Sequence, residues 1–298
     1  MRNGKVALVT GSSTGIGAAV ARQLAKDGYD IAVHYSSSKE AGEAVLEKVL
    51  AEGVNGCLLS GNLTDVEVPG RLVKECVEKL GRLDVLINNA GVTRFEDLRE
   101  IKPETMDLLY QLDFRGMILC AKAAANYMVP NKIPGVILFN TSIRSFSPHT
   151  SDAVYAGLKA GLNRAIESFA IDLGPYGIRV NGFSPGVIDV KTPEDQDSRD
   201  SMWFRDHWRY IPLRRVGRPV DMGNVVSLLV SDKADYITGQ VIRADGGLSV
   251  PGVADNMGDL FRIYEIKDLV ENYNEDDERK KIEEMRYQRR KEKEEQNK

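Results

Sequence analysis

The stretch Val6-Ala-Leu-Val-Thr-Gly-Ser-Ser-Thr-Gly-Ile-Gly17 decides the fold of this chain. Its apolar run, Val6–Val9, predicts a short strand that is buried on both faces of a sheet. Glycines at 11, 15 and 17 follow and lead into a helical pattern near residues 15–28. Glycine allows a tight turn and the close approach of a ligand, and the first turn of a helix offers unpaired N–H groups to an anion. This order predicts a site for a pyrophosphate group.

The same alternation of short apolar runs and amphipathic stretches continues to about residue 250. We therefore predict an α/β fold: a single-domain, Rossmann-like, doubly wound parallel sheet of about seven strands, with helices on both faces. The predicted strands are Val6–Val9, Ile31–Val33, Gly56–Leu59, Val85–Ile87, Val136–Phe139, Ile178–Val180 and Val241–Ala244. The predicted helices lie near residues 15–28, 39–53, 66–80, 103–129, 155–174 and 219–232.

The composition changes after Pro251-Gly252, so we divide the chain into a domain of residues 1–250 and an extension of residues 251–298. Apolar residues recur at helical spacing within residues 259–273, which predicts an amphipathic helix. From Asn274 onward the chain is almost wholly charged. This C-terminal helical extension is either an exposed tail or a contact with a partner or subunit.

The overall composition excludes several classes of partner. The 298 residues carry a net charge of −4, which gives no electrostatic reason to expect binding to nucleic acid or to an anionic membrane. The three cysteines and three histidines are scattered without the spacing of metal ligands, so we expect no metal site. The N-terminal apolar stretch is too short for a signal or membrane segment, and the cytoplasm is the expected location.

Tyr155-Ala-Gly-Leu-Lys159 is the candidate for the chemistry. Residues four apart share one face of a helix, so Lys159 would lie beside the phenol of Tyr155. A free phenol has a pKa of about 10. A nearby ammonium group stabilises the phenolate and suits the phenol to acid/base work near neutrality. Ser142 follows the strand Val136–Phe139, where its hydroxyl could polarise a substrate oxygen.

Taken together, these motifs resemble the short-chain dehydrogenase/reductase family over roughly residues 3–248, with likeness to its glucose 1-dehydrogenase and 3-oxoacyl-carrier-protein reductase types. Thr10–Gly17 is similar to the family's cofactor turn and Asn88-Asn-Ala-Gly91 to its second signature. The resemblance implies an NAD(P)-dependent oxidoreductase that interconverts a secondary alcohol and a ketone by hydride transfer. It implies Ser142, Tyr155 and Lys159 as the catalytic set, and a homo-oligomer, dimer or tetramer, built through helices 103–129 and 155–174.

The resemblance also assigns residues to the cofactor. They are Gly11, Ser13, Thr14, Gly15, Ile16, Gly17, Tyr35, Ser36, Ser37, Asn62, Leu63, Asn89, Ala90, Gly91, Tyr155, Lys159, Pro185, Gly186 and Ile188. The second strand ends in His34-Tyr-Ser-Ser-Ser-Lys39, with no acid before Glu40 to hold a ribose 2′-hydroxyl. NADP(H) is therefore favoured. NAD(H) stays open because the arginine common in NADP-preferring relatives is missing.

Two departures from the family pattern bear on the site. Asp113 stands where the family usually has an asparagine, and we count it with the catalytic set. A carboxylate cannot donate as an amide does, so a proton relay to Lys159 through this position requires Asp113 to accept. Val190 occupies the place where relatives often carry a threonine.

The sequence determines the substrate less closely than it determines the fold and the reaction. Residues 187–216 are expected to form a variable lid rich in aromatic and arginine side chains, and Arg144, His149 and Trp203 are the candidate substrate contacts. They favour a small polar alcohol or ketone such as a sugar, polyol or sugar acid. Two alternatives remain: a reductase of 3-oxoacyl or steroid ketones, and a catalytically weak binding protein that senses the dinucleotide.

Overall fold

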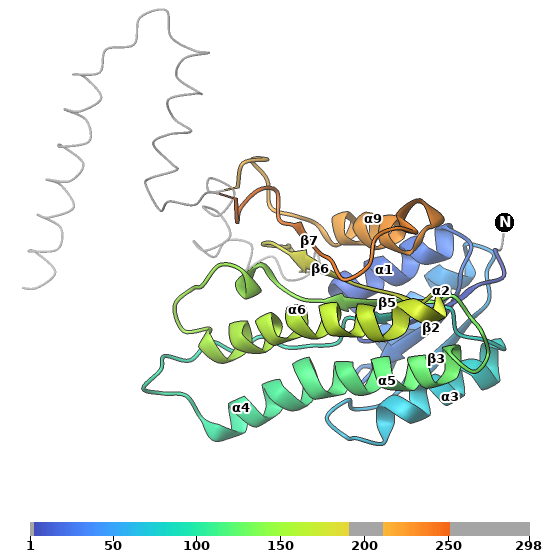
Figure 1. Ribbon diagram of the computed structural model, residues 1–298, viewed down its shortest axis with the longest axis horizontal. Coiled ribbons are helices and arrows are strands. Elements are labelled where there is room, and N and C mark those ends of the chain that lie inside the picture. The colour runs from blue at the N-terminus through green and yellow to red at the C-terminus, as the bar shows by residue number, and fades with distance from the viewer. Residues whose placement is uncertain (1–2, 191–210, 251–298) are drawn as a thin grey trace, which may run out of the picture. The chain divides into compact units, whose positions relative to one another are not determined.

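The computed structural model describes residues 3–190 and 211–250 (Figure 1). Strands and helices alternate along most of this part of the chain, as the apolar pattern predicted. The strands are β1 Val6–Val9, β2 Asp30–Tyr35, β3 Gly56–Ser60, β4 Val85–Asn88, β5 Val136–Asn140, β6 Arg179–Pro185 and β7 Val241–Ala244. The α-helices are α1 Gly15–Lys26, α2 Lys39–Leu50, α3 Val68–Leu80, α4 Pro103–Leu109, α5 Met117–Met128, α6 Ala153–Leu173 and α9 Pro219–Val230.

The strands form one parallel sheet in the order β3-β2-β1-β4-β5-β6-β7. The chain builds outward from β1 to β3, then returns to the other side of β1 and builds outward again from β4. This confirms the predicted doubly wound sheet of seven strands. In such a sheet, ligands bind outside the carboxyl ends of the strands where the order reverses, which here is between β1 and β4.

Helices cover both faces of the sheet (Figure 1). Side chains of α1, α2 and α9 pack with Ala7 and Val9 of β1 on one face, whereas those of α3, α5 and α6 pack with Val6 and Leu8 on the other. Successive side chains of a strand point to opposite faces, so a strand buried on both faces must be apolar at every position. That is why β1 could be recognised from four consecutive apolar residues.

The helix predicted over residues 103–129 contains a break in its hydrogen-bond register. α4 and α5 are joined by a π-helical turn, Tyr110–Gly116, in which Asp113 lies. A π turn inserts one residue into a helix, and such turns occur frequently at functional sites. Apolar spacing carries no clear signal for a single inserted residue, so the sequence pattern predicted one uninterrupted helix.

Strand β6 is longer than the predicted Ile178–Val180. It extends through Asn181 and Ser184, which are fully buried polar residues, to Pro185 at its last position. An apolar pattern ends where polar residues begin, and burial of those residues is decided by neighbouring strands β5 and β7.

Residues Met1–Pro251 group into one compact unit. The predicted helical extension, residues 251–298, lies outside the described residues, so the division at residue 250 stays a prediction. Within the described ranges, none of the helices has the length and apolar character needed to cross a bilayer.

Candidate active site

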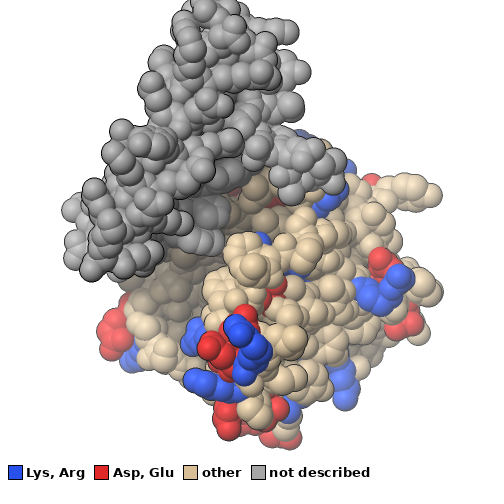
Figure 2. All heavy atoms as spheres, turned by 90° about the vertical axis from the view of Figure 1, so that its left-hand side faces the viewer, with Lys and Arg blue, Asp and Glu red and all other residues tan. Residues whose placement is uncertain are grey.

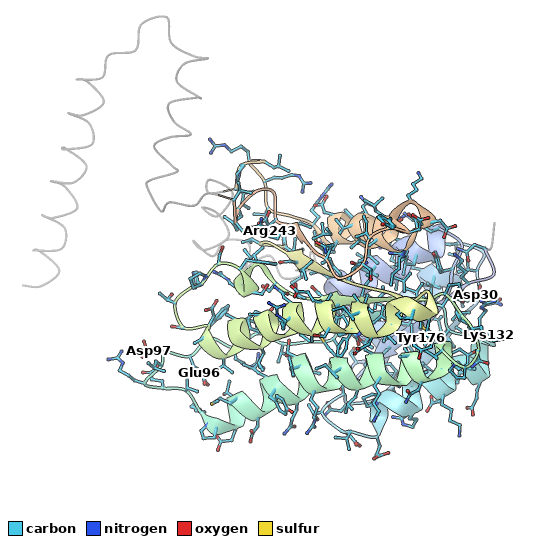
Figure 3. All side chains as sticks on the ribbon, viewed as in Figure 1. Asp30, Glu96, Asp97, Lys132, Tyr176 and Arg243 are labelled. Carbon is cyan, nitrogen blue, oxygen red and sulfur yellow. The ribbon has the colours of Figure 1, made fainter. Side chains whose placement is uncertain are left out.

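A cleft of ≈ 760 Å³ lies at the carboxyl ends of the strands, where the doubly wound topology predicts a ligand site. Figure 3 helps to locate this edge: Glu96 and Asp97, on the loop that follows β4, lie at one end of the molecule. Asp30, Lys132 and Tyr176, which precede or begin strands, lie at the other end. On the face visible in Figure 2, which looks onto the first of these ends, acidic and basic side chains lie beside one another.

The glycine-rich turn is held in place by Asn89, the residue directly after β4. The Asn89 amide nitrogen donates to the carbonyl oxygens of Thr10 (3.0 Å) and Gly11 (3.1 Å), and its amide oxygen accepts from Asn140 Nδ2 (2.9 Å). A Cβ at Gly17 would collide with the Gly11 carbonyl and the Asn89 amide. Glycine is therefore required at residue 17 by this close approach.

The first turn of α1 is left open to a ligand. Thr14 is the N-cap residue, but its side chain accepts no hydrogen bond from the helix. The first N–H groups of a helix have no partner within the helix and carry a partial positive charge. Gly15 and Gly17 line the cleft at this point, where the missing side chains give access to those groups.

His34, at the end of β2, joins the glycine turn to the next loop. Gly11 N–H donates to His34 Nδ1 (2.9 Å), so the proton is on Nε2, which lies 3.0 Å from the carbonyl oxygen of Gly61 and donates to it. Burial lowers the pKa of His34 from its ordinary 6.5 to about 4, and the neutral ring is the form that makes both bonds.

The cleft beyond β2 is rich in hydroxyl groups. Ser36, Ser37 and Ser38 line it, and the Ser38 hydroxyl also accepts from Ala41 N at the start of α2. Among the described residues that line the cleft, only Asp113 has a carboxyl group, and it lies near Lys159 rather than near these serines. Lys39 lies beside the serines and forms an exposed ion pair with Glu43 at 3.2 Å.

The chemical end of the cleft is formed by β5 and α6. Lys159 is almost fully buried and its Nζ donates to the carbonyl oxygen of Asn140 (3.1 Å). The same nitrogen lies 5.6 Å from the centre of the Tyr155 ring, as their spacing on one helical face requires. Ser142 follows β5 and accepts from Arg144 N (3.2 Å), which fixes the position of its hydroxyl oxygen on the same cleft.

Asp113 contacts Lys159 directly. Asp113 Oδ1 lies 3.1 Å from Lys159 Nζ, and Oδ2 accepts from Val92 N (3.0 Å). A Cβ at Gly91 would collide with Oδ1, so this glycine makes room for the carboxylate. Burial raises the pKa of Asp113 above the ordinary carboxyl value, and the Lys159 ammonium and the Val92 N–H oppose that rise.

The structure brings most of the predicted site residues onto this one cleft. Those that line it are Gly11, Ser13, Thr14, Gly15, Ile16, Gly17, Ser36, Ser37, Asn62, Leu63, Asn89, Ala90, Gly91, Asp113, Ser142, Tyr155, Lys159, Pro185, Gly186 and Ile188. Tyr35 does not line it: its side chain faces Gly42 of α2. The reason is the alternation along β2, which turns Tyr35 away from the face on which His34 lies.

The predicted substrate residues are not gathered in the cleft lining. Arg144 is half-buried near Asp152, with Nε 3.7 Å from Oδ2, and His149 is exposed with Nδ1 3.0 Å from the carbonyl oxygen of Thr150. Trp203 lies outside the described residues. Several lining residues were missed by the sequence reading: His34, Ser38, Gly61, Val92, Thr93, Leu112, Asn140 and Thr141. Most follow a strand end, and that position is the signal that could have identified them.

Comparison with known proteins agrees with this geometry. A family model described as "Enoyl-(Acyl carrier protein) reductase" matches residues 11–249. A 3-oxoacyl-[acyl-carrier-protein] reductase of Staphylococcus aureus is 38% identical over 250 residues, which are 83% of this chain and 99% of the relative. The chain belongs to the short-chain dehydrogenase/reductase family.

Solved structures of this family superpose on the same part of the chain. Acetoin dehydrogenase YohF from Salmonella typhimurium has a TM-score of 0.75 at 29% identity, covering 84% of this chain and 98% of its own. A blue fluorescent protein from a metagenomic library, in complex with NADPH, has a TM-score of 0.76 at 30% identity and covers 83% and 98%. The protein is thus an oxidoreductase of the short-chain dehydrogenase/reductase type, acting on carbonyl or alcohol groups.

The short-chain dehydrogenase/reductase family uses a nicotinamide dinucleotide, and the residues of this cleft fit one. The open N-terminus of α1 suits the pyrophosphate, and the cleft volume is in the range of small-molecule sites.

No group of three or more His, Cys, Asp or Glu that could hold a metal occurs in the described part of the chain. Burial raises the pKa of Cys57 to about 11 and that of Cys120 to about 12, which makes these thiols poor nucleophiles.

Proposed function

We propose that this protein is an NADP(H)-dependent reductase that converts a 3-oxo group of an acyl substrate to a secondary alcohol. The observation that carries the reaction is the presence of Ser142, Tyr155 and Lys159 on the same cleft as the open N-terminus of α1. The acyl substrate is supported by the 38% identity with the S. aureus 3-oxoacyl reductase over almost all of that relative.

Tyr155, Ser142 and Lys159 have different roles in the proposed reaction. The nicotinamide, when bound, supplies the hydride for reduction or accepts it for oxidation. Tyr155 donates its phenolic proton to the substrate oxygen during reduction and takes it back during oxidation. Ser142 donates a hydrogen bond to the same oxygen, and the charge of Lys159 stabilises the phenolate that remains on Tyr155.

The hydroxyl-rich end of the cleft supports NADP(H) over NAD(H). Ser36, Ser37 and Ser38 line the cleft and offer donors to a 2′-phosphate, and Lys39, the next residue along the chain, offers an exposed cation. Among the described residues, no carboxylate forms part of the cleft wall at this end, so a 2′-phosphate would meet none there. A 2′-hydroxyl, conversely, would lack its usual acidic partner.

The likeness to acetoin dehydrogenase YohF supports a second candidate, a small hydroxyketone. The sugar or polyol predicted from the aromatic lid depends on residues 191–210, which lie outside the described part of the chain. The acyl and small-ketone candidates differ in the size of the group beside the carbonyl, and a substrate panel separates them.

The test is NADPH and NADH oxidation by the wild type and Tyr155→Phe with acetoacetyl and longer 3-oxoacyl thioesters, acetoin, diacetyl and keto sugars. We expect turnover with NADPH and the thioesters, and a loss of about a thousandfold or more in Tyr155→Phe, the upper range for removing an acid/base group. Binding of NADPH, followed by fluorescence, should persist in the variant. Turnover confined to keto sugars would contradict the acyl proposal, and equal turnover in both proteins would contradict the role of Tyr155.

We also propose that the protein is a homo-oligomer through α4, α5 and α6. Large apolar side chains are exposed on α4, on the π-helical turn that follows it and on α6, among them Met106 (47%), Tyr110 (46%) and Ile171 (77%). Light scattering coupled to size-exclusion chromatography should give the mass of a dimer or tetramer, and Ile171→Glu should shift it toward that of one chain.

A further inference from the structure

The catalytic lysine of this cleft is neutralised by a carboxylate at contact distance. Lys159 Nζ and Asp113 Oδ1 are 3.1 Å apart, and the two side chains are 4% and 1% exposed. With water excluded, a unit charge acts on its neighbours much more strongly than at the surface. The electrostatic effect of Lys159 on Tyr155 is therefore inseparable from that of Asp113.

We propose that Asp113 is a positioning residue which offsets the charge of Lys159 and keeps Tyr155 in its phenol form up to a higher pH. This inference rests on the proposed function, in which Tyr155 is the proton donor. The phenol is the form that donates to a ketone, so Asp113 suits the cleft to reduction near neutral pH. In the same way it moves the onset of alcohol oxidation, which needs the phenolate, to higher pH.

The surroundings hold the carboxylate in this position. Val92 N donates to Oδ2, Gly91 leaves space for Oδ1, and the π-helical turn Tyr110–Gly116 carries the side chain into the cleft. Asn140 accepts from Lys159 through its carbonyl oxygen, which adds no charge. Neutral backbone groups thus hold both side chains of the ion pair, and its geometry is fixed.

Other charged groups act on the same set from neighbouring elements. Arg94, on the loop after β4, acts on Asp113, and Arg144, in the turn after Ser142, acts on Tyr155. Asp152, at the N-cap of α6, lies 3.7 Å from Arg144 and partly offsets it. These three remain in any variant of residue 113, so their contributions cancel when the variant is compared with the wild type.

The experiment is a pH titration of Tyr155 in the full-length protein without added cofactor. Tyrosine labelled with ¹³C at Cζ gives one NMR resonance for each ring, and the resonance of Tyr155 is the one that Tyr155→Phe lacks. We expect the midpoint of its titration to fall by at least about one pH unit in Asp113→Asn, because this variant removes the buried negative charge that offsets Lys159. Asp107→Asn makes the same chemical change at an exposed position of α4 and should leave the midpoint unchanged.

An unchanged midpoint in Asp113→Asn would overturn the inference, because it would mean that residue 113 contributes no charge to the site. Asparagine is nearly isosteric with aspartate and can keep the bond from Val92 N. If circular dichroism shows that this variant does not fold, Asp113→Ser removes the same charge with a smaller side chain and carries the same expectation.

The pH dependence of the kinetics is a second test, and its outcomes distinguish a failure of this inference from a failure of the proposed function. In Asp113→Asn, the acid limb of kcat/KM for alcohol oxidation and the basic limb for ketone reduction should both move to lower pH by the amount seen in the titration. A change in rate without movement of either limb would show a purely structural role and contradict the inference. If the wild type turns over no substrate in the panel, the proposed function fails, while the NMR titration still decides the role of Asp113.

Discussion

Two pairs of lysine and carboxylate stand near opposite ends of the cleft, at almost the same separation. Lys159 and Asp113 are 3.1 Å apart at the chemical end, and Lys39 and Glu43 are 3.2 Å apart beside the serine-rich end. The side chains of the first pair are 4% and 1% exposed, whereas those of the second are 62% and 53% exposed. Distance alone would make the two pairs equivalent, and burial makes them different.

The difference shows that burial decides whether an ion pair is held in one arrangement or can exchange partners. In the buried pair both partners are almost wholly shielded from water, so each depends on the other and both are held in place. In the exposed pair, water and salt screen the attraction, and Lys39 is free to leave Glu43 for a stronger partner. A fixed charge suits the acid/base role proposed for Tyr155, and a charge that can change partner suits the phosphate contact proposed for Lys39.

The largest expected effect comes from breaking the buried pair. Lys159→Met leaves Asp113 buried without its cation, which should lower the free energy of unfolding by about 3–5 kcal/mol in urea titrations at pH 7. Asp113→Asn combined with Lys159→Met should recover most of this loss, because no uncompensated charge remains. Lys39→Met should change the melting temperature by less than about 2 °C. Equal losses in the two single variants would contradict the comparison.

The next largest effect is a loss of folding stability at low pH, which comes from a buried histidine at the otherwise exposed serine-rich end. His34 lies there but is 1% exposed, and its pKa is lowered from 6.5 to about 4. The unfolded chain takes up a proton near pH 6.5 while the folded chain does not, so stability is complete above that pH and is lost as the pH falls toward 4. The loss should reach about 3 kcal/mol by pH 4, measured by urea unfolding across this range.

His34→Gln should remove most of that pH dependence, since a glutamine amide can accept from Gly11 and donate to Gly61 without titrating. His149→Gln, at an exposed histidine, should keep it. Should both variants retain the full dependence between pH 4 and 6.5, another group would be responsible.

A smaller effect is expected on the choice of cofactor. Lys39→Glu places a negative charge beside the site proposed for the 2′-phosphate and should lower kcat/KM for NADPH roughly tenfold relative to NADH. The matched control is Lys48→Glu, an exposed position in the last turn of the same helix, which should leave the ratio unchanged. A ratio that stays constant in Lys39→Glu would show that Lys39 does not contact the cofactor.

The smallest effect sharpens the contrast between a fixed charge and a charge that can change partner. Glu43→Gln removes the competitor for Lys39 and should lower the KM for NADPH by about twofold at low salt, with the difference disappearing at high salt. Glu47→Gln on the same helix serves as the control. A change that persists at high salt would point to a contact other than a screened charge.

The residues that line the cleft at the glycine-rich turn were largely predictable, because they are neighbours in sequence. The turn from Gly11 to Gly17 lies between a strand and a helix that are both visible as patterns, so its role could be argued from the residues themselves. Tyr35 and His34 show the limit of that argument. They are adjacent in sequence, yet only His34 lines the cleft, because the alternation of β2 places the two side chains on opposite faces.

The chemical end was predictable only in part. Tyr155 and Lys159 share a helical face, which follows from their spacing. Asp113 was singled out as a departure from a family pattern, and sequence left open whether it could act on Lys159. The π-helical turn, the glycine at 91 and the burial of both partners together answer that question, and none of the three is visible in the apolar pattern.

The sequence by itself determined the alternation of buried strands and amphipathic helices, and with it the doubly wound sheet, because the periodicity of apolar residues is a local property of the chain. It also determined which residue types stand at the strand ends. Only the tertiary structure decided that Asp113 meets Lys159 away from water and that Lys39 meets Glu43 in it. Burial depends on which segments pack together, and the same two opposite charges acquire different consequences once that packing sets their surroundings.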